Sequence, residues 1–426
     1  MSKPQPTAAA QDTAQERVTY LEAVRGLACL QVFFLHLISA FLPLLAFGAA
    51  DEGLLGRLHH SPLFFLFDGY TAVYLFFVLS GYVLTRAFDK RPASLSILAS
   101  ARVVRLAVPV MLSVLVAYGI TLMFAGANAE AGALVGSEWL RTNQAGDLSV
   151  VGAFKDAFIQ APFVGYGGAS FLYGFPGLGA PPPASFAYNA PMWTLSIELY
   201  GALIVYFLCA SRKINKALWW GVLLVLGFVF FNMYMLPFLV GHLMAHYQVA
   251  ERAPRMHPVL GWGLIALGVI LCVRAEDITF AVFSWAAQPQ ISVMPQATAM
   301  HMQKIYGACL IFVGITQVQW LRHKLSAPRL STLGAYSFAL YLCHWAFIFG
   351  PASAVFVLAA STINIPVASG LAILTAIGLS IVGTHLFKRI DDLAVSWARV
   401  TKRSLLGLQA RQEQENTTST AARPQA

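Results

Sequence analysis

Three ionisable side chains stand in the first apolar stretch of the chain, where a charge is costly and usually functional. They are Glu22, Arg25 and His36. Arg25 and His36 are eleven residues apart, so on a helix they share a face and lie about 16 Å from each other along the axis. The guanidinium could bind an anion, and the imidazole could move a proton or act as a nucleophile. Alternatively, Arg25 pairs with Glu22 and His36 only hydrogen-bonds a neighbouring helix.

A second candidate site is the pair Arg102 and Arg105 in Ala-Arg-Val-Val-Arg-Leu-Ala-Val-Pro. Residues three apart lie on one face of a helix. Two guanidinium groups side by side suit phosphate or pyrophosphate oxygens. Taken alone, the pair could equally be two membrane anchors.

The third candidate is the segment that holds Trp193, Ser196 and Glu198, within Asn-Ala-Pro-Met-Trp-Thr-Leu-Ser-Ile-Glu-Leu-Tyr. Asn189 and Pro191 are residues that start helices, which places Glu198 one to two turns inside the membrane from its outer face. A carboxylate at that depth needs a partner. It could orient a donor, bind a sugar hydroxyl or support His36, or it could make a structural hydrogen bond.

Histidine occurs at helical spacing in two later segments. Ser337, Tyr341 and His344 form a polar stripe on one face of an otherwise apolar helix. His242 and His246 have the spacing of a zinc-binding pair. They have no companion Glu between them and no obvious third ligand, so we expect no metal site.

The amino-acid composition indicates that these residues belong to an integral membrane protein. Apolar residues make up 58% of the 426 and charged residues 11%, against about 45–50% and about 25% in soluble domains. A soluble enzyme and a disordered chain are thereby excluded, and a nucleic-acid binder is disfavoured despite the net charge of +9. We expect an all-α, polytopic membrane protein of about ten transmembrane helices, which lie roughly at 20–48, 68–88, 106–127, 191–210, 218–234, 236–249, 259–274, 300–320, 331–358 and 366–388.

The basic residues give an orientation for these helices. With ten crossings, all but five of the 28 Lys and Arg fall on one side; the five are Arg57, Arg141, Lys155, Arg274 and Lys304. In membrane proteins, the short loops on the cytoplasmic side of the membrane are enriched in Lys and Arg. We therefore expect a multi-pass protein of a bacterial inner membrane with both termini in the cytoplasm and no cleaved signal peptide.

The chain divides by polarity into three parts. Residues 1–19 are a polar, cytoplasmic N-terminus, 20–390 the ten-helix domain, and 391–426 a basic, disordered cytoplasmic tail. Within the domain, 128–190 is a long, aromatic-rich extracytoplasmic loop. We expect it to cap the bundle, with a short amphipathic helix near 150–160.

The motifs together resemble the acyltransferase-3 family of integral-membrane acyltransferases that modify extracytoplasmic glycans. The resemblance covers residues 18–390. It rests on Tyr-Leu-Glu-Ala-Val-Arg-Gly-Leu-Ala at 20–28 followed by His36, Leu-Phe-Phe-Val-Leu-Ser-Gly-Tyr at 75–82, the Arg-x-x-Arg pair at 102–105, Trp-Thr-Leu-Ser-Ile-Glu at 193–198, and the segment from Ser337 through His344. Two positions depart from it: Leu199 stands where many members have a second Glu, and Tyr74 where many have Asp.

The resemblance implies a ten-helix fold, acyl-coenzyme A as cytoplasmic donor (acetyl by default) and a glycan hydroxyl as acceptor. It marks Arg25, Arg102 and Arg105 as donor-binding residues and His36 as base or transient acyl carrier. We further expect Glu198 to assist catalysis from the acceptor side, and substrate contacts from Trp193, Ser196, Tyr341 and His344.

Two other classes compete with this interpretation. Buried charges and a central His also suit a proton-coupled transporter, although the sequence shows no inverted repeat. A flippase-like partner of a polysaccharide synthase is the third class. Beyond coenzyme A, glycan and membrane lipid we expect no nucleic-acid partner, and the sequence leaves the oligomeric state open, a dimer included.

Overall fold

The computed structural model describes residues 8–48, 53–90, 93–144, 148–173, 180–247, 257–273, 280–287 and 297–421. Every regular element in these ranges is a helix, as expected for an all-α fold. The longer α-helices are α1 (Ala8–Phe41), α4 (Gly69–Lys90), α5 (Leu95–Met123), α9 (Trp193–Ile214), α10 (Lys216–Phe230), α11 (Leu236–His246), α12 (Pro258–Val273), α14 (Ala299–Gln317), α16 (Pro328–Phe347) and α18 (Ile365–Ala421).

Fewer than ten of these helices are long enough to cross a membrane by themselves. Within the described ranges, six stretches are both long and apolar enough: Thr19–Phe41, Gly69–Lys90, Leu95–Met123, Ala190–Ile214, Pro328–Ala360 and Ile365–Gln412. A seventh would be α14 together with α15 (Gln319–Leu325), which are bent by 93° at their junction.

The expected count of ten is therefore not confirmed. All ten expected segments contain a helix, but α10, α11 and α12 have 15, 11 and 16 residues. At a rise of 1.5 Å per residue the longest of them is about 24 Å, shorter than the roughly 30 Å hydrocarbon layer. The chain is nevertheless a membrane protein, because six of its helical stretches in the described ranges are long and apolar enough to cross a membrane.

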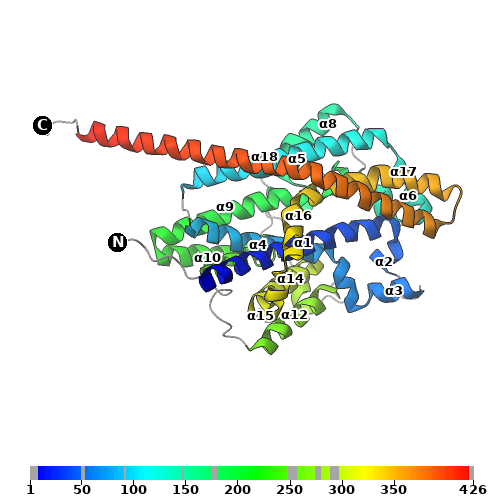
Figure 1. The fold of residues 1–426 in the computed structure, drawn as a ribbon, viewed down its shortest axis with the longest axis horizontal. Coiled ribbons are helices and arrows are strands. Elements are labelled where there is room, and N and C mark those ends of the chain that lie inside the picture. Colours follow the sequence, from blue (N-terminus) through cyan, green and yellow to red (C-terminus); the bar gives the residue numbers. More distant parts are fainter. Residues whose placement is uncertain are drawn as a thin grey trace.

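The ribbon shows how the bundle is oriented. The start of α1 and the end of α18 lie at the same end of the molecule, which we call the termini end, while α2 (Pro43–Phe47), α3 (Gly53–His59) and α6 (Ala127–Val135) lie at the opposite, far end (Figure 1). Helices α1, α4, α9 and α18 run along this axis. Residues at successive positions of α1 thus mark successive depths in the bundle.

Helices α1 and α16 pack closely because two glycines face each other across their contact. A Cβ on Gly26 would lie 2.5 Å from Cβ of Leu333, and one on Gly334 would lie 2.8 Å from Cα of Glu22. Real side chains do not tolerate such contacts. Small residues allow membrane helices to approach closely in this way. This approach brings the helix that carries His36 against the helix that carries His344.

The 128–190 segment is mostly helical rather than an irregular loop. It contains α6, α7 (Glu138–Thr142), α8 (Val150–Lys155) and a π-helix at Asp156–Val164, with short 3-10 turns after them. The short helix expected near 150–160 is present as α8 and the π-helix. Most of the Gly- and Pro-rich stretch, residues 174–179, lies outside the described residues.

The chain after residue 391 was expected to be a disordered tail, but in the structure α18 continues as a helix to Ala421. Pairs at helical spacing stabilise it: Lys388 forms an ion pair with Asp392 at i+4 and lies 3.8 Å from Asp391 at i+3. Helix α1 likewise begins at Ala8, within the part expected to be a polar N-terminus. Residues 1–7 and 422–426 lie outside the described chain.

Candidate active site

Two imidazole rings meet inside the bundle. His36 on α1 and His344 on α16 lie with Nδ1 of His36 2.8 Å from Nε2 of His344. Their rings are parallel, with an interplanar angle of 6° and centroids 5.1 Å apart. Sequence reasoning assigned the two residues to different roles, base and substrate contact, whereas the structure joins them in one hydrogen-bonded pair.

The hydrogen bonds of His344 determine where the protons of the neutral pair lie. Nδ1 of His344 is 3.0 Å from the carbonyl oxygen of Leu340, which can only accept, so this nitrogen carries a hydrogen. Nε2 of a neutral His344 is then an acceptor, and Nδ1 of His36 must donate to it. The proton of His36 is thereby held on Nδ1, which leaves Nε2 of His36 with a free lone pair.

Aromatic rings surround His36 on two sides. Trp139 stacks on it with centroids 5.7 Å apart, and Trp345 meets it edge-on at 5.2 Å. The indole Nε1 of Trp345 is buried and has no hydrogen-bond partner among the described residues. A buried N–H without a partner is uncommon and costs about 1–3 kcal/mol, so it marks a position where a polar substrate atom would be favourable.

Trp139 is held in place by the short helix α7. Ser137 caps this helix by accepting from the Leu140 amide at 3.1 Å, and its hydroxyl donates at 2.6 Å to the carbonyl of Ser39 on α1. On the outer side, hydrogen bonds from Arg141 lower the pKa of the Glu138 carboxyl. The segment predicted to cap the bundle therefore supplies a ring to the environment of His36.

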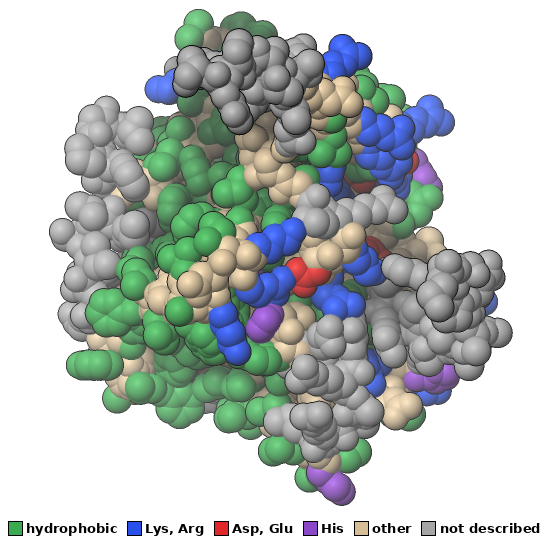
Figure 2. Space-filling model, turned by 90° about the vertical axis from the view of Figure 1, so that its left-hand side faces the viewer, with side chains coloured by type: hydrophobic (Ala, Val, Ile, Leu, Met, Phe, Trp, Pro, Cys, Tyr) green, Lys and Arg blue, Asp and Glu red, His purple; other side chains and the backbone are tan. Residues whose placement is uncertain are grey.

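The bundle also contains a cavity of about 630 Å³, which we call the basic pocket. The face that Figure 2 presents shows Lys and Arg side chains gathered around a few carboxylates. The pocket is formed mainly by α1, α4, α5, α9, α16 and α18. Its charged lining consists of the cations Arg25, Arg102, Arg105, Lys388, Arg399 and Lys402 and the anions Glu22, Glu198, Asp391 and Asp392.

All three arginines predicted to bind the donor line this pocket, and two of them have carboxylate partners. Arg25 donates to both carboxylate oxygens of Glu22, at 3.0 and 2.9 Å. This is the Arg25–Glu22 pair that the sequence offered as an alternative. Arg102 forms an ion pair with Glu198. Arg105 has no carboxylate within ion-pair distance among the described residues.

Glu198 was expected to act from the acceptor side, near the outer face, but it lies in the basic pocket. Its Oε1 accepts from Arg102 and from the hydroxyl of Ser80 on α4. The reason is that the long side chain of Arg102 on α5 reaches the second turn of α9, where a carboxylate largely excluded from water needs a cation. Glu198 makes no hydrogen bond with the histidine pair in the described structure.

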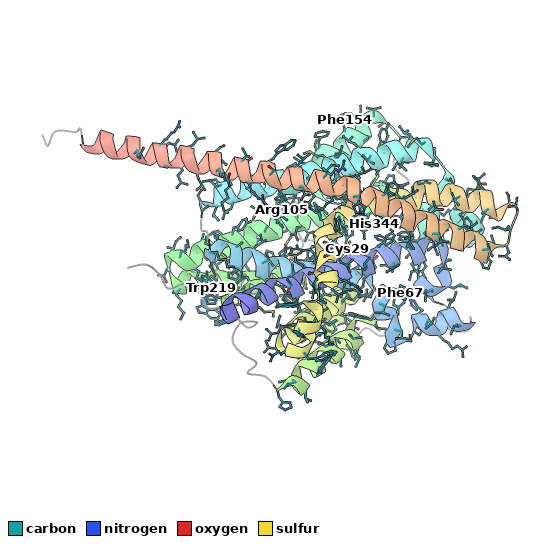
Figure 3. All side chains as sticks on the ribbon, in the orientation of Figure 1. Cys29, Phe67, Arg105, Phe154, Trp219 and His344 are labelled. Atoms are coloured by element: carbon teal, nitrogen blue, oxygen red, sulfur yellow. The ribbon has the colours of Figure 1, made fainter. Side chains whose placement is uncertain are left out.

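Tyr341 lies between the basic pocket and the histidine pair. It belongs to the pocket lining, and its ring centroid is 5.8 Å from that of His344. Figure 3 shows Arg105 closer to the termini end than His344. Tyr341 thus links the lining of the pocket to the pair, and neither histidine lines the pocket itself. The Tyr341 hydroxyl itself donates to the Pro191 carbonyl at 2.7 Å and lies 2.8 Å from the Thr194 hydroxyl, so it holds the start of α9.

The other two predicted substrate contacts lie apart from the histidine pair. The Trp193 ring packs against Tyr234, with centroids 5.8 Å apart. Ser196 is fully buried and donates weakly to the Trp193 carbonyl at 3.4 Å. It faces the turn at Gly165, where an added Cβ would collide with it. Neither residue lines the basic pocket.

His242 is engaged through both ring nitrogens. Trp219 donates to its Nε2 at 3.1 Å, so its Nδ1 carries the proton and lies 2.8 Å from the Thr85 hydroxyl. His246 lies 2.7 Å from a guanidinium nitrogen of Arg212. Among the described residues no three His, Cys, Asp or Glu side chains gather as a metal site would require.

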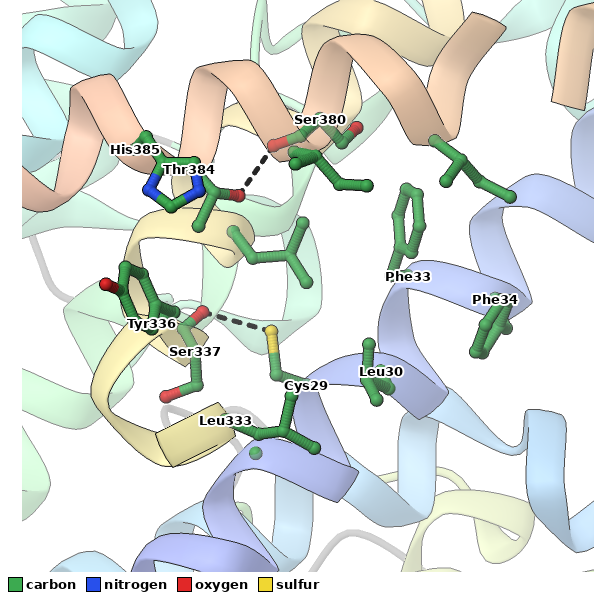
Figure 4. A pocket seen from close by; sticks show the side chains of 14 residues that line it. Cys29, Leu30, Phe33, Phe34, Leu333, Tyr336, Ser337, Ser380, Thr384 and His385 are labelled. Atoms are coloured by element: carbon green, nitrogen blue, oxygen red, sulfur yellow. Dashed lines mark hydrogen bonds between the residues drawn. The ribbon is translucent and has the colours of Figure 1, made fainter. Parts of the chain in front are cut away.

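A second cavity, of about 320 Å³, lies between α1, α16 and α18 (Figure 4). Its walls are almost entirely apolar. Two of its polar groups are bonded: Cys29 donates to the Ser337 carbonyl at 3.0 Å, and Thr384 to the Ser380 carbonyl at 2.6 Å. The Ser380 hydroxyl is buried and has no hydrogen-bond partner among the described residues. Phe33 borders this cavity and meets His344 edge-on at 5.9 Å.

Sequence reasoning missed several residues of these sites. Trp139 was noted only as one aromatic of the loop, and Ser80 only as part of a motif. Arg399 and Lys402 of α18 were assigned to a disordered tail. One signal was available for them, because Lys388, Asp392, Arg399 and Lys402 fall on one face of a helix.

Comparison with known proteins gives one match. A protein-family model, described as an acyltransferase domain, matches residues 18–385. Searches of curated proteins and of solved structures found no match. The matched range contains both histidines of the pair and the three predicted donor-binding arginines. The chain therefore belongs to the acyltransferase-3 family and is a membrane acyltransferase.

Proposed function

We propose that the protein transfers an acyl group, by default acetyl, from cytoplasmic acyl-coenzyme A to a hydroxyl of an extracytoplasmic glycan. The observation that supports this most is the juxtaposition of a basic pocket with a histidine pair at its inner side. An anionic thioester donor needs cations at one end and a base or nucleophile at the other, and the pocket and the pair offer these in that order.

The donor enters from the termini end, which is cytoplasmic in the proposed orientation. Its phosphates interact with the cations of the basic pocket, and the pantetheine arm extends past Tyr341. About 16 Å separate Arg25 from His36 along α1, a length that such an arm can cover. The acceptor hydroxyl approaches His36 from the far end, beneath α7 and Trp139.

The lone pair on Nε2 of His36 can serve the reaction in two ways. As a base, Nε2 takes the hydroxyl proton while the oxygen attacks the thioester carbonyl. The C–S bond then breaks, and the thiolate leaves and takes up the proton. As a nucleophile, Nε2 itself attacks the carbonyl carbon, the C–S bond breaks and the thiolate leaves. The hydroxyl oxygen then displaces Nε2 from the acyl carbon, and the hydroxyl proton passes to the thiolate. In both routes, negative charge develops on the carbonyl oxygen of the thioester. The indole N–H of Trp345, which has no partner among the described residues, can donate a hydrogen bond to this oxygen.

Binding of coenzyme A to the purified full-length protein tests the proposal against the transporter and flippase alternatives. We expect saturable binding that is weakened at least tenfold in an Arg102→Gln, Arg105→Gln double variant. His36→Ala should bind as the wild type does, since His36 does not line the basic pocket. Absence of coenzyme A binding by the wild type would refute the donor assignment and favour a transporter.

A further inference from the structure

The part of α18 from Lys388 to Lys402 forms one wall of the basic pocket. Seven of its residues line the cavity, with spacings of three and four that place them on one face of the helix. They are Lys388, Asp391, Asp392, Val395, Ala398, Arg399 and Lys402. The end of α18 extends beyond the other helices at the termini end (Figure 1). Arg399 and Lys402 are the lining residues of α18 that lie nearest along the helix to this end.

The cations of the pocket divide into two groups by their partners. Arg25, Arg102 and Lys388 are each paired with a carboxylate of the pocket. Arg105, Arg399 and Lys402 have none within ion-pair distance in the described part of the chain. Arg105 is repelled by Arg102 and Arg25 and attracted by the more distant carboxylates Asp391 and Glu198. An anion bound among Arg105, Arg399 and Lys402 would be attracted by all three cations.

We infer that Arg399 and Lys402 of α18, together with Arg105 of α5, form the anion-binding site of the pocket, and that this site takes the phosphate groups of the nucleotide part of the donor. The inference rests on the proposed function, because coenzyme A is the donor considered there. The paired arginines Arg25 and Arg102 are then neutralised residues that shape the pocket, and the unpaired cations carry the phosphate recognition. This assigns a binding role to the helix that the sequence presented as a tail.

The proximity of the wall to the solvent predicts how the site behaves. Arg399 is exposed and Lys402 half-exposed, so their attraction for phosphate is screened by salt. Coenzyme A carries a 3′-phosphate in addition to its pyrophosphate, and dephospho-coenzyme A lacks it. Arg399 and Lys402 should interact with the 3′-phosphate. The wild type should therefore bind coenzyme A more tightly than dephospho-coenzyme A, and this difference should be smaller once the two cations are removed.

The test is a titration of full-length protein in detergent with both ligands. The variants are Arg399→Gln, Lys402→Gln and, as a control of the same charge change, Arg389→Gln, Arg403→Gln, whose residues lie on the same helix but outside the pocket lining. We expect the first to raise the Kd for coenzyme A about tenfold or more, to reduce its salt dependence and to bring the two ligands closer in affinity. The control should bind as the wild type does.

Three outcomes are separable. If the Arg399, Lys402 variant and the control both bind coenzyme A with the wild-type Kd, the inference is overturned and the proposed function stays intact. An equal loss in both variants would also overturn it, because the effect would then be one of net charge. No binding by the wild type would refute the donor assignment and this inference together. Thermal unfolding of each variant shows that it is folded.

Discussion

Nδ1 of His36 lies 2.8 Å from Nε2 of His344, and the other nitrogen of His344 is bonded to the carbonyl of Leu340. This chain of hydrogen bonds holds the proton of His36 on the nitrogen that faces its partner. In the proposed mechanism the opposite nitrogen is the group that does the chemistry. His344 is then a positioning residue, and its effect on the reaction should be exerted through the tautomer and orientation of His36.

Replacement of His344 should therefore lower turnover without weakening donor binding. We expect His344→Leu to reduce kcat by about 10²-fold, in line with the loss of a positioned base. His344→Gln should restore part of it, because its amide oxygen can accept from Nδ1 of His36. Initial rates and coenzyme A titrations on both variants measure this. Equal rates for Gln and Leu would argue against a role in tautomer selection.

The ion pair between Arg102 and Glu198 should contribute more to stability than an exposed pair does, because the two side chains are only 10% and 17% exposed. Glu198→Ala leaves a largely buried arginine without a partner, a loss of up to about 3–5 kcal/mol for a fully buried pair. The Arg102→Met, Glu198→Ala double variant should recover part of the loss. A double-mutant cycle of unfolding free energies checks this, and strict additivity would contradict the coupling.

Trp139 should affect catalysis more than donor binding, since it stacks on His36 and does not line the basic pocket. We predict that Trp139→Ala lowers kcat about tenfold and that Trp139→Phe, which keeps a ring for stacking, loses less. The Kd of coenzyme A should stay at the wild-type value in both. A change confined to the Kd would place this residue in the donor site instead.

Close packing of α1 on α16 should depend on Gly334. A Cβ there would lie 2.8 Å from Cα of Glu22, and overpacking of this kind costs about 1–3 kcal/mol. Gly334→Ala should lower the Tm and also the activity, because the shift separates His36 from His344. Gly378→Ala on α18, where a Cβ meets nothing within 4 Å, is the matched control and should leave the Tm unchanged or raise it.

Much of the fold follows from local sequence properties, and its limits are physical. Hydropathy locates all ten apolar segments because each is a continuous run in the chain. It does not determine whether a short helix such as α11 crosses the membrane, since that depends on how its neighbours shield its ends. The helical continuation of α18 was missed because its polar composition resembles that of a disordered segment, whereas its spacing of charges is helical.

Only part of the candidate site, in its members and in its contacts, could be predicted from the sequence. The three arginines gather as expected because motif spacing and charge asymmetry place them at one end of the bundle. The pairing of His36 with His344, 308 positions later, depends on the glycine contact between α1 and α16. The partner of Glu198 was likewise set by tertiary packing, and no local pattern in the sequence encodes it.

In the proposed mechanism, His36 is the group through which acyl transfer occurs. The most direct test uses membranes that contain the full-length protein and its native glycan acceptor, supplied with radiolabelled acetyl-coenzyme A. We predict that label enters the glycan fraction with the wild type and that His36→Ala lowers this transfer at least 10²-fold while binding coenzyme A normally. Transfer at the wild-type rate by His36→Ala would contradict the account.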